Sequence, residues 1–241
     1  MLPNDYSTVS SLSGLKAQSD EERVILNKSP AANPIYLEAP NQAISLFYQE
    51  HGLQIMPRNQ WETNNVISKL NGALGMLGQV PSALEGVTSL VRMIQVVDSG
   101  DPEIDVSYSH PQLPFTIFVS VCEDNSEISQ LRVAESILHE AMHLKLSLIE
   151  RVVPLIKPDA NGLYFSPWRD EKRPAQGVLH GMFVFRTILD FSQMLSQTTF
   201  ANNPLNERVI EINEQLEALQ QFTQAKALTE YGANLSKSLL P

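Results

Sequence analysis

The chain has little of three features that would restrict its cellular setting. It contains one cysteine, Cys122, among 241 residues, so no disulfide can form within the chain and no oxidising compartment is required. Its longest apolar run without charge, near Leu113–Cys122, is far shorter than the ~20 residues of a membrane-spanning helix. The first residues lack the basic and apolar segments of a secretory signal. We therefore expect a cytoplasmic protein with no membrane partner.

Basic residues are also scarce. Seventeen Lys and Arg stand against 27 Asp and Glu, which gives a formal net charge of −10. This balance argues against general binding of nucleic acid or of an anionic membrane surface. With 43% hydrophobic and 18% charged residues, the composition is that of a globular protein. No pattern in the sequence specifies an oligomeric state.

The distribution of proline and of apolar residues predicts the domain organisation. The segment 1–40 is polar and interrupted by prolines, so we expect an extended N-terminal arm, with a single, mainly helical domain over 41–241. Helical spacing of apolar residues predicts five helices. The first starts around Asn41, with a periodicity that strengthens after Trp61. The others start at Pro81 (running through Ile94), at Glu127 (ending at Glu150), at Gln176 (ending near Ser196) and at Asn203.

Two segments have the pattern of β-strands, and both precede the helix predicted from Glu127. Ile104, Val106 and Tyr108 alternate with polar residues, and Phe115–Val121 is rich in β-branched and aromatic side chains. Pro114 indicates either an edge strand or the entry to a strand. The segment from about 154 to 173 reads as a long loop. The predicted fold class is mainly α, a helical domain with a small β element preceding the metal-binding helix.

The most informative motif is His139-Glu140-Ala141-Met142-His143 within the predicted helix. Residues four apart lie one turn apart on the same helix face, so two imidazoles at this spacing can bind one metal ion. The intervening glutamate stands where a general base for metal-bound water would stand. Together they belong to one polar stripe on an otherwise apolar helix. The alternative is a chance match on a core helix whose histidines are hydrogen-bonded.

Two histidines leave the coordination of a catalytic metal incomplete, because such metals usually have three protein ligands. His180 follows one loop later, early in an apolar helix, and we favour it as the third ligand over the alternative of a satisfied core histidine. His51 and His110 lie in turn-like surroundings, where a loop or solvent role is the better interpretation.

The segment that precedes the helix with His180 also has a functional interpretation. In Ser166-Pro167-Trp168-Arg169, the indole could form an apolar wall and the guanidinium could clamp a carboxylate. The alternative is a charged surface loop in which Asp170 and Glu171 pair with Lys172 and Arg173.

These motifs together resemble a known family. A helix with His-Glu-x-x-His, then Ser-Pro-Trp-Arg with Arg-Pro close behind, then Leu-His-Gly opening an apolar helix, is similar to the HExxH-motif peptide-modification proteins of ribosomal peptide natural-product clusters. The resemblance covers roughly residues 60 to 200. Members act as iron(II)- and 2-oxoglutarate-dependent hydroxylases of peptide side chains.

The resemblance implies a role for each matching residue. His139, His143 and His180 would bind Fe(II), and Glu140 would be catalytic or orient a ligand. Arg169 or Arg173 would hold 2-oxoglutarate, with Arg132 and Arg186 as further candidates. Trp168 and Ser166 would line the substrate pocket, and a precursor peptide would be the partner.

Two other functions remain open at this stage. A zinc metallopeptidase would use the same three histidines for Zn²⁺ and Glu140 as general base. A non-catalytic peptide-binding protein could have kept the ligand residues. The compact spacing His-Glu-x-x-His-x-x-Gly-x-x-His of one peptidase class is absent, because Leu146 and Ile149 occupy its last two fixed positions.

Overall fold

A computed structural model describes residues 23–26, 33–101, 104–122, 124, 126–198 and 203–241. It is 53% helical with a small mixed sheet, which agrees with the predicted mainly α class. The chain forms two compact units, Met1–Leu144 and Lys145–Pro241, and their boundary falls within helix α5 (Glu127–Glu150). Among the described residues, no helix combines the length and apolarity required to cross a membrane.

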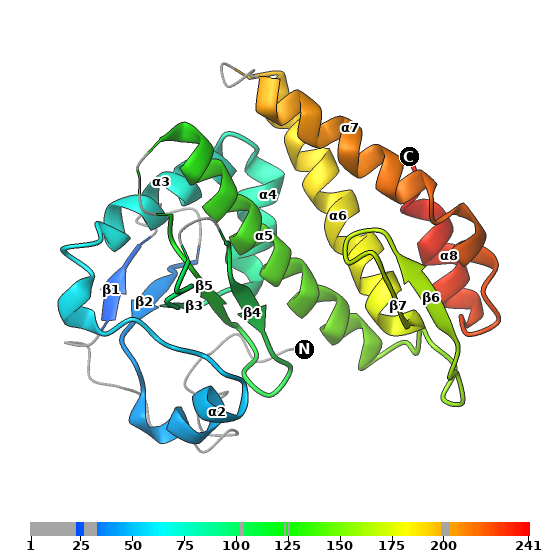
Figure 1. Cartoon of the computed structure of the whole chain (residues 1–241), viewed down its shortest axis with the longest axis horizontal. Coiled ribbons are helices and arrows are strands. Elements are labelled where there is room, and N and C mark those ends of the chain that lie inside the picture. Colours follow the sequence, from blue (N-terminus) through cyan, green and yellow to red (C-terminus); the bar gives the residue numbers. More distant parts are fainter. Residues whose placement is uncertain (1–22, 27–32, 102–103, 123, 125, 199–202) are drawn as a thin grey trace. The chain divides into compact units, whose positions relative to one another are not determined.

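The first unit contains a five-stranded sheet in the order β1-β2-β3-β5-β4 (Figure 1). Its strands are β1 (Arg23–Ile25), β2 (Tyr36–Glu38), β3 (Met93–Val96), β4 (Ser107–Ser109) and β5 (Thr116–Val119). The three central strands β2, β3 and β5 run parallel, whereas β1 and β4 pair antiparallel to their neighbours at the two edges. The sheet is thus larger than the two strands that the sequence indicates.

The central strands explain one wrong prediction. The helix expected from Pro81 through Ile94 ends earlier, because α4 spans Pro81–Leu90 and Met93–Val96 is strand β3. Every residue of β3 and of β5 is buried. A short apolar run that is buried on both faces lacks the alternation of a strand, so its periodicity resembles that of a buried helix. Since β5 lies between β3 and β4, Pro114 marks the entry to a strand and not an edge.

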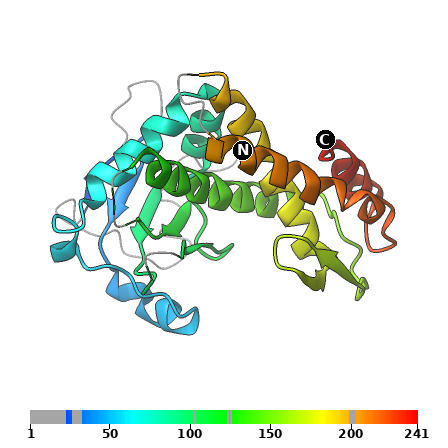
Figure 2. The same ribbon diagram turned by 45° about the horizontal axis from the view of Figure 1, so that its top comes forward.

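Helices cover both faces of this sheet (Figure 2). Helices α3 (Val66–Gly78), α4 and α5 pack together on one face, where Gly72 meets Gln130 and Gly86 meets Met142. The short helix α2 (Ser45–Glu50) lies on the other face, with Phe47 stacked against Phe118 of β5. Two 3-10 turns, Gln42–Ile44 (η2) and Arg58–Gln60 (η3), complete the part of the unit that the structure describes.

A chain of buried polar side chains crosses three strands of the same sheet. Tyr48 donates its hydroxyl to Gln95 (2.8 Å), and the amide of Gln95 donates to Glu38 (3.0 Å). Arg23 closes the chain with an ion pair to Glu38 (3.1 Å). Buried polar groups are costly without partners, so these bonds allow the sheet to hold a carboxylate in its interior.

The second unit is built on α6 (Ala175–Ser196). Helix α7 (Asn203–Glu217) packs along it, followed by a 3-10 turn at Gln220–Gln224 (η4) and by α8 (Glu230–Ser238). Gly232 of α8 lies against the backbone of Leu155, and an added Cβ would be 2.1 Å from the Leu155 carbonyl oxygen. The close approach of α8 therefore requires glycine at this position.

A two-stranded hairpin, β6 (Leu163–Ser166) and β7 (Glu171–Pro174), precedes α6. The expected loop over 154–173 is therefore partly regular, and the Ser166-Pro167-Trp168-Arg169 segment forms the end of β6 and the turn. The predicted division into an arm at 1–40 and one domain at 41–241 stays a prediction. The described part of that arm includes strands β1 and β2.

Candidate metal centre

The helix that carries the histidine motif has a well-defined start. Ser126 accepts the backbone N–H of Ser129 through its hydroxyl (3.1 Å), and Asp124 accepts the backbone N–H of Ser126 (2.9 Å). These bonds satisfy amide groups that a helix N-terminus leaves without intrahelical partners. Hydrogen bonds from Ser129 and Ser126 lower the pKa of Asp124, so its carboxylate is ionised and faces the positive end of the helix.

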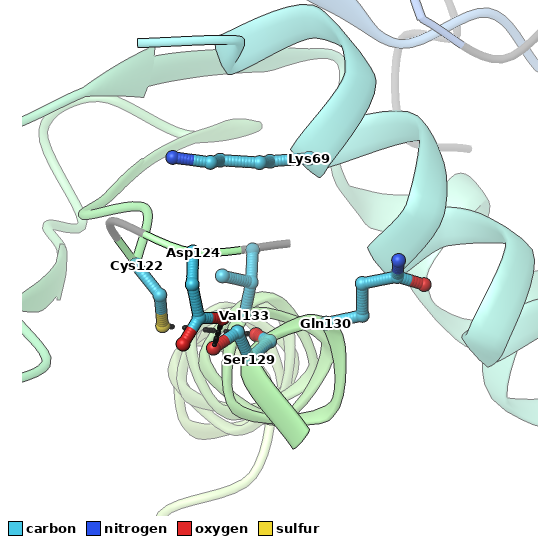
Figure 3. Close-up of a pocket in the computed structure, with 6 residues that line it drawn as sticks. All are labelled: Lys69, Cys122, Asp124, Ser129, Gln130 and Val133. Atoms are coloured by element: carbon cyan, nitrogen blue, oxygen red, sulfur yellow. Dashed lines mark hydrogen bonds between the residues drawn. The ribbon is translucent and has the colours of Figure 1, made fainter. Parts of the chain in front are cut away.

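A small hollow beside this start is lined by Lys69 of α3 and by residues next to or within α5 (Figure 3). Burial raises the pKa of the Cys122 thiol, which contacts the Ser129 carbonyl at 3.7 Å. A buried, protonated thiol is a poor nucleophile and a poor metal ligand. The hollow is therefore explained by the capping of α5 and not by chemistry at Cys122.

His139 and His143 meet on one face of α5, as their spacing predicts. Their Nε2 atoms lie 3.1 Å apart and their ring centroids 4.7 Å apart. Both side chains are half-buried. Two nitrogens at this separation, each bound to one metal at about 2.0–2.1 Å, subtend about 100° at the metal, which suits tetrahedral or octahedral coordination. The pair therefore fits a divalent metal without rearrangement of the helix.

The polar stripe predicts that Glu140 lies beside the two histidines, but its hydrogen-bond partners come from strand β4. Its two carboxylate oxygens accept the hydroxyls of Ser107 (2.7 Å) and Ser109 (2.6 Å) from edge strand β4, and the residue is only 4% exposed. One of these oxygens, Oε1, also lies 4.0 Å from His139 Nε2. The carboxylate thus links the helix to the sheet while it stays beside the histidine nitrogens.

The electrostatics of this carboxylate follow from its burial. Burial raises the pKa of Glu140, and the hydrogen bonds from Ser109 and Ser107 offset only part of the increase. Tyr108, between the two serines on β4, has a raised pKa because of burial and of the nearby Glu140 charge. A carboxylate with a raised pKa is a stronger base than an exposed one, which is the property that proton abstraction needs.

His180 belongs to the second unit, where its partner is Glu150 at the end of α5. The Nε2 of His180 donates to Glu150 Oε2 at 3.0 Å, and Gln176 donates to the same oxygen at 3.0 Å. Because an ionised carboxylate only accepts hydrogen bonds, the neutral imidazole carries its lone pair on Nδ1. Burial tends to raise the pKa of Glu150, but the bonds from His180 and Gln176 outweigh it and lower that pKa.

The hairpin motif has a packing role that the sequence does not reveal. Trp168 stacks on Phe185 with ring centroids 4.7 Å apart and planes at 4°. It also covers Gly181, where an added Cβ would lie 2.5 Å from the indole ring. Ser166 is buried. The assignment of Trp168 and Ser166 to a substrate pocket stays a prediction. The contact with Trp168 does explain why position 181 is a glycine.

The candidate arginines differ in the partners that their guanidinium groups contact. Arg132 binds Asp105 (2.8 Å), and Arg186 binds Asp190 (3.0 Å) and the Leu240 carbonyl (2.8 Å). Arg173 lies 3.8 Å from Glu171, an ion pair of the kind that the charged-loop alternative predicts. Arg169 is exposed at the hairpin turn.

Sequence reasoning missed Ser107, Ser109 and Glu150. The alternation of Ile104, Val106 and Tyr108 does place both serines on the opposite face of β4. Nothing in the sequence identifies that face as the one that contacts α5. Glu150 lies on the same face of α5 as His143, but only the fold of the second unit pairs it with His180.

Within the described residues, no group of three or more His, Cys, Asp or Glu side chains is arranged to hold a metal ion. The fit to a metal therefore rests on the His139–His143 pair. Neither the scan of protein-family models nor the search of curated proteins gives a match for this chain.

Proposed function

We propose that this chain is a metal-dependent enzyme that modifies a peptide, an iron(II)/2-oxoglutarate-dependent hydroxylase of a side chain in a ribosomally made precursor peptide. The observation that supports it most directly is the 3.1 Å separation of the Nε2 atoms of His139 and His143. Imidazole nitrogens are ligands for Fe(II), and three on one metal leave positions open for a cosubstrate. Bound Fe(II) with 2-oxoglutarate and O₂ would supply the oxidising chemistry.

His180 is proposed as the third ligand on the sequence pattern and the resemblance. Its bond to Glu150 is of a kind common in metal sites, where a carboxylate orients the imidazole and raises its basicity through the nitrogen that does not bind metal. We therefore propose coordination through Nδ1 of His180. Arg169 and Arg173 are proposed to bind the 2-oxoglutarate carboxylate. Arg169 is exposed at the hairpin turn, and the 3.8 Å ion pair of Arg173 with Glu171 is longer than the 2.8 Å pair of Arg132 with Asp105.

A peptide substrate is supported by the open edge of β4. Val106 pairs with Ser120 through a backbone bond, so the alternation of an antiparallel ladder turns the N–H and C=O groups of Ser107 and Ser109 away from β5. In the described part of the chain, no strand pairs with this edge. An extended peptide could add here as a further strand, next to Glu140 and the histidine pair.

The second candidate is a zinc metallopeptidase, and one observation favours it. Glu140 Oε1 lies 4.0 Å from His139 Nε2, and burial raises the pKa of this carboxylate. A base in that place could take a proton from metal-bound water, which is the role of the glutamate in this motif. Glu140 would then be the catalytic residue, with Zn²⁺ as the metal.

The test is anaerobic titration of the metal-free protein with Fe(II) and then 2-oxoglutarate, followed by visible absorption. The hydroxylase predicts a metal-to-ligand charge-transfer band that His143→Ala abolishes. His51→Asn is a matched control that removes an imidazole elsewhere and should keep the band. Stoichiometric zinc binding without the band would favour the peptidase, which Glu140→Gln should inactivate. Failure of both metals to bind would contradict both functions.

A further inference from the structure

Strand β4 holds the carboxylate of Glu140 through two serines on one face of the strand. Ser107 and Ser109 are two residues apart, so their side chains point to the same side of the sheet. The hydroxyl of Ser107 donates to Glu140 Oε1 at 2.7 Å, and the hydroxyl of Ser109 donates to Oε2 at 2.6 Å. Each carboxylate oxygen therefore has its own donor, which fixes both the position and the rotation of the carboxylate.

The segment that carries these serines is anchored on its other face. Val106 and Tyr108 pack there against a buried apolar cluster. The cluster consists of Tyr48, Val97, Leu113 and Phe118. Two hydrogen bonds also join Val106 to Ser120, one from the Val106 backbone N–H to the Ser120 hydroxyl (2.9 Å) and one from the Ser120 N–H to the Val106 carbonyl (2.7 Å). The two serine hydroxyls therefore belong to a strand that packing and hydrogen bonds hold in place.

Glu140 lies close enough to the histidine pair to become a further ligand of the same metal. Its Oε1 is 4.0 Å from His139 Nε2, and the Nε2 of His143 is 3.1 Å from the same nitrogen. With metal–ligand bonds of about 2.0–2.2 Å, two ligand atoms of one metal are about 3 Å apart, so a shift of about 1 Å would make the carboxylate a ligand. Two imidazoles and one carboxylate are a common ligand set for Fe(II).

We propose that Ser107 and Ser109 are positioning residues that hold Glu140 outside the coordination sphere of a metal bound by His139 and His143. This inference rests on the proposed function, because it requires that the histidine pair binds a metal. Held by two hydroxyls, the carboxylate stays next to the metal as a base or as an orienting group. The coordination position that it would otherwise occupy remains open for water or a cosubstrate.

The experiment is titration of metal-free protein with Co(II) alone, because the visible absorption of Co(II) depends on its ligands and their geometry. Ser107→Ala with Ser109→Ala releases Glu140, and the gain of a ligand should change the spectrum and increase the affinity for Co(II). If the serines only orient groups around the metal, their loss should weaken binding by about 10–100-fold. We expect an increase of about tenfold, within the same range of magnitude but of opposite sign. Weaker or equal binding with the wild-type spectrum would overturn the proposal.

Two further variants identify the source of the gain. Glu140→Gln should leave the spectrum of Co(II) on the wild-type protein unchanged, but it should remove the gain in affinity when it is added to the double alanine variant. A gain that persists without the carboxylate would contradict the proposal. Ser107→Thr with Ser109→Thr keeps both hydroxyls, so it should keep the wild-type affinity and spectrum. Should the double alanine variant not fold, Ser107→Ala alone frees Oε1, the oxygen nearer to His139, and should show the same change in spectrum.

The wild-type protein and His143→Ala separate this inference from the proposed function. His143→Ala should abolish Co(II) binding, which shows that the titration reports on the histidine pair. Co(II) binding by wild type that the serine substitutions leave unaltered would overturn only the role of the serines. Failure of wild type and of every serine variant to bind Co(II) would contradict the metal-dependent function and, with it, this inference.

Discussion

Two glutamates of helix α5, one in each unit, have carboxylates with different hydrogen-bond donors and different pKa shifts. Glu140 lies in the first unit and accepts two serine hydroxyls. Glu150 lies in the second unit and accepts from an imidazole and an amide. The pKa of Glu140 is raised by burial, whereas that of Glu150 is lowered because its hydrogen bonds outweigh burial. Identical residue types therefore have opposite shifts.

The difference follows from the depth of each group and the charge of its partners. Glu140 is almost wholly buried, both of its hydrogen-bond donors are neutral hydroxyls, and the nearest imidazole nitrogen, of His139, lies 4.0 Å away. Glu150 is partly exposed and faces an imidazole that can carry a proton. Burial disfavours the charged form most where no opposite charge is near. The first site is therefore suited to proton uptake and the second to orientation of a histidine.

Removal of both hydroxyl donors of Glu140 is the strongest way to test the comparison. Ser107→Ala with Ser109→Ala should lower the free energy of unfolding by about 3 kcal/mol, because hydrogen bonds to a buried charged group are lost together. Urea denaturation measures the change. Ser89→Ala is a matched control, since the hydroxyl of Ser89 is exposed and donates to a carbonyl. A loss no larger than in this control would show that the two serines do not stabilise the carboxylate.

The opposite pKa shifts predict opposite dependences on pH. A folded-state pKa that is raised, as for Glu140, means that the folded protein binds the proton more tightly, so wild type gains stability relative to Glu140→Gln as pH falls. A lowered pKa, as for Glu150, contributes stability above the unfolded pKa that is lost as pH falls through the folded pKa. The slope for one group cannot exceed about 1.4 kcal/mol per pH unit. Thermal or urea unfolding of metal-free protein between about pH 8 and pH 4 measures how the contribution of each glutamate to stability changes with pH. Slopes of the same sign for Glu140 and Glu150 would contradict the opposite pKa shifts.

Loss of Glu150 should have a smaller effect than loss of the two serines. Glu150→Ala removes the acceptor of both His180 and Gln176, and we expect about 1 kcal/mol of destabilisation after allowing for solvent screening of this partly exposed group. The same variant should change the tautomer balance of His180, which imidazole NMR measures. An unchanged His180 spectrum would show that Glu150 does not orient it.

The smallest effect is expected at Gln176. Gln176→Ala removes one exposed amide donor to Glu150, and we expect a loss of about 0.5 kcal/mol in the free energy of unfolding. Glu150→Ala and the double variant should then be equally stable, because both bonds share one acceptor. A further loss in the double variant would show that Gln176 stabilises the unit in another way.

Long, strongly periodic elements were predictable from local sequence. The helix expected from Glu127 to Glu150 and the one from Gln176 to near Ser196 agree with α5 and α6. Their length and apolar spacing are typical of a helix and not of a strand. Strand β3 was missed because burial on both faces removes the alternation of a strand. The hairpin β6–β7 was missed because its strands have only four residues each and are mostly exposed, and because β7 consists of three charged residues and a proline.

The same limit applies to the candidate site. Local sequence was enough to show that His139 and His143 share one helix face, since residues four apart lie one turn apart on any α-helix. The contacts of the neighbouring polar groups depend instead on the packing of the folded chain. Glu140 turns to the serines of β4, Glu150 meets His180, and His51 meets His110, because these contacts join segments distant in sequence through packing that no local pattern encodes.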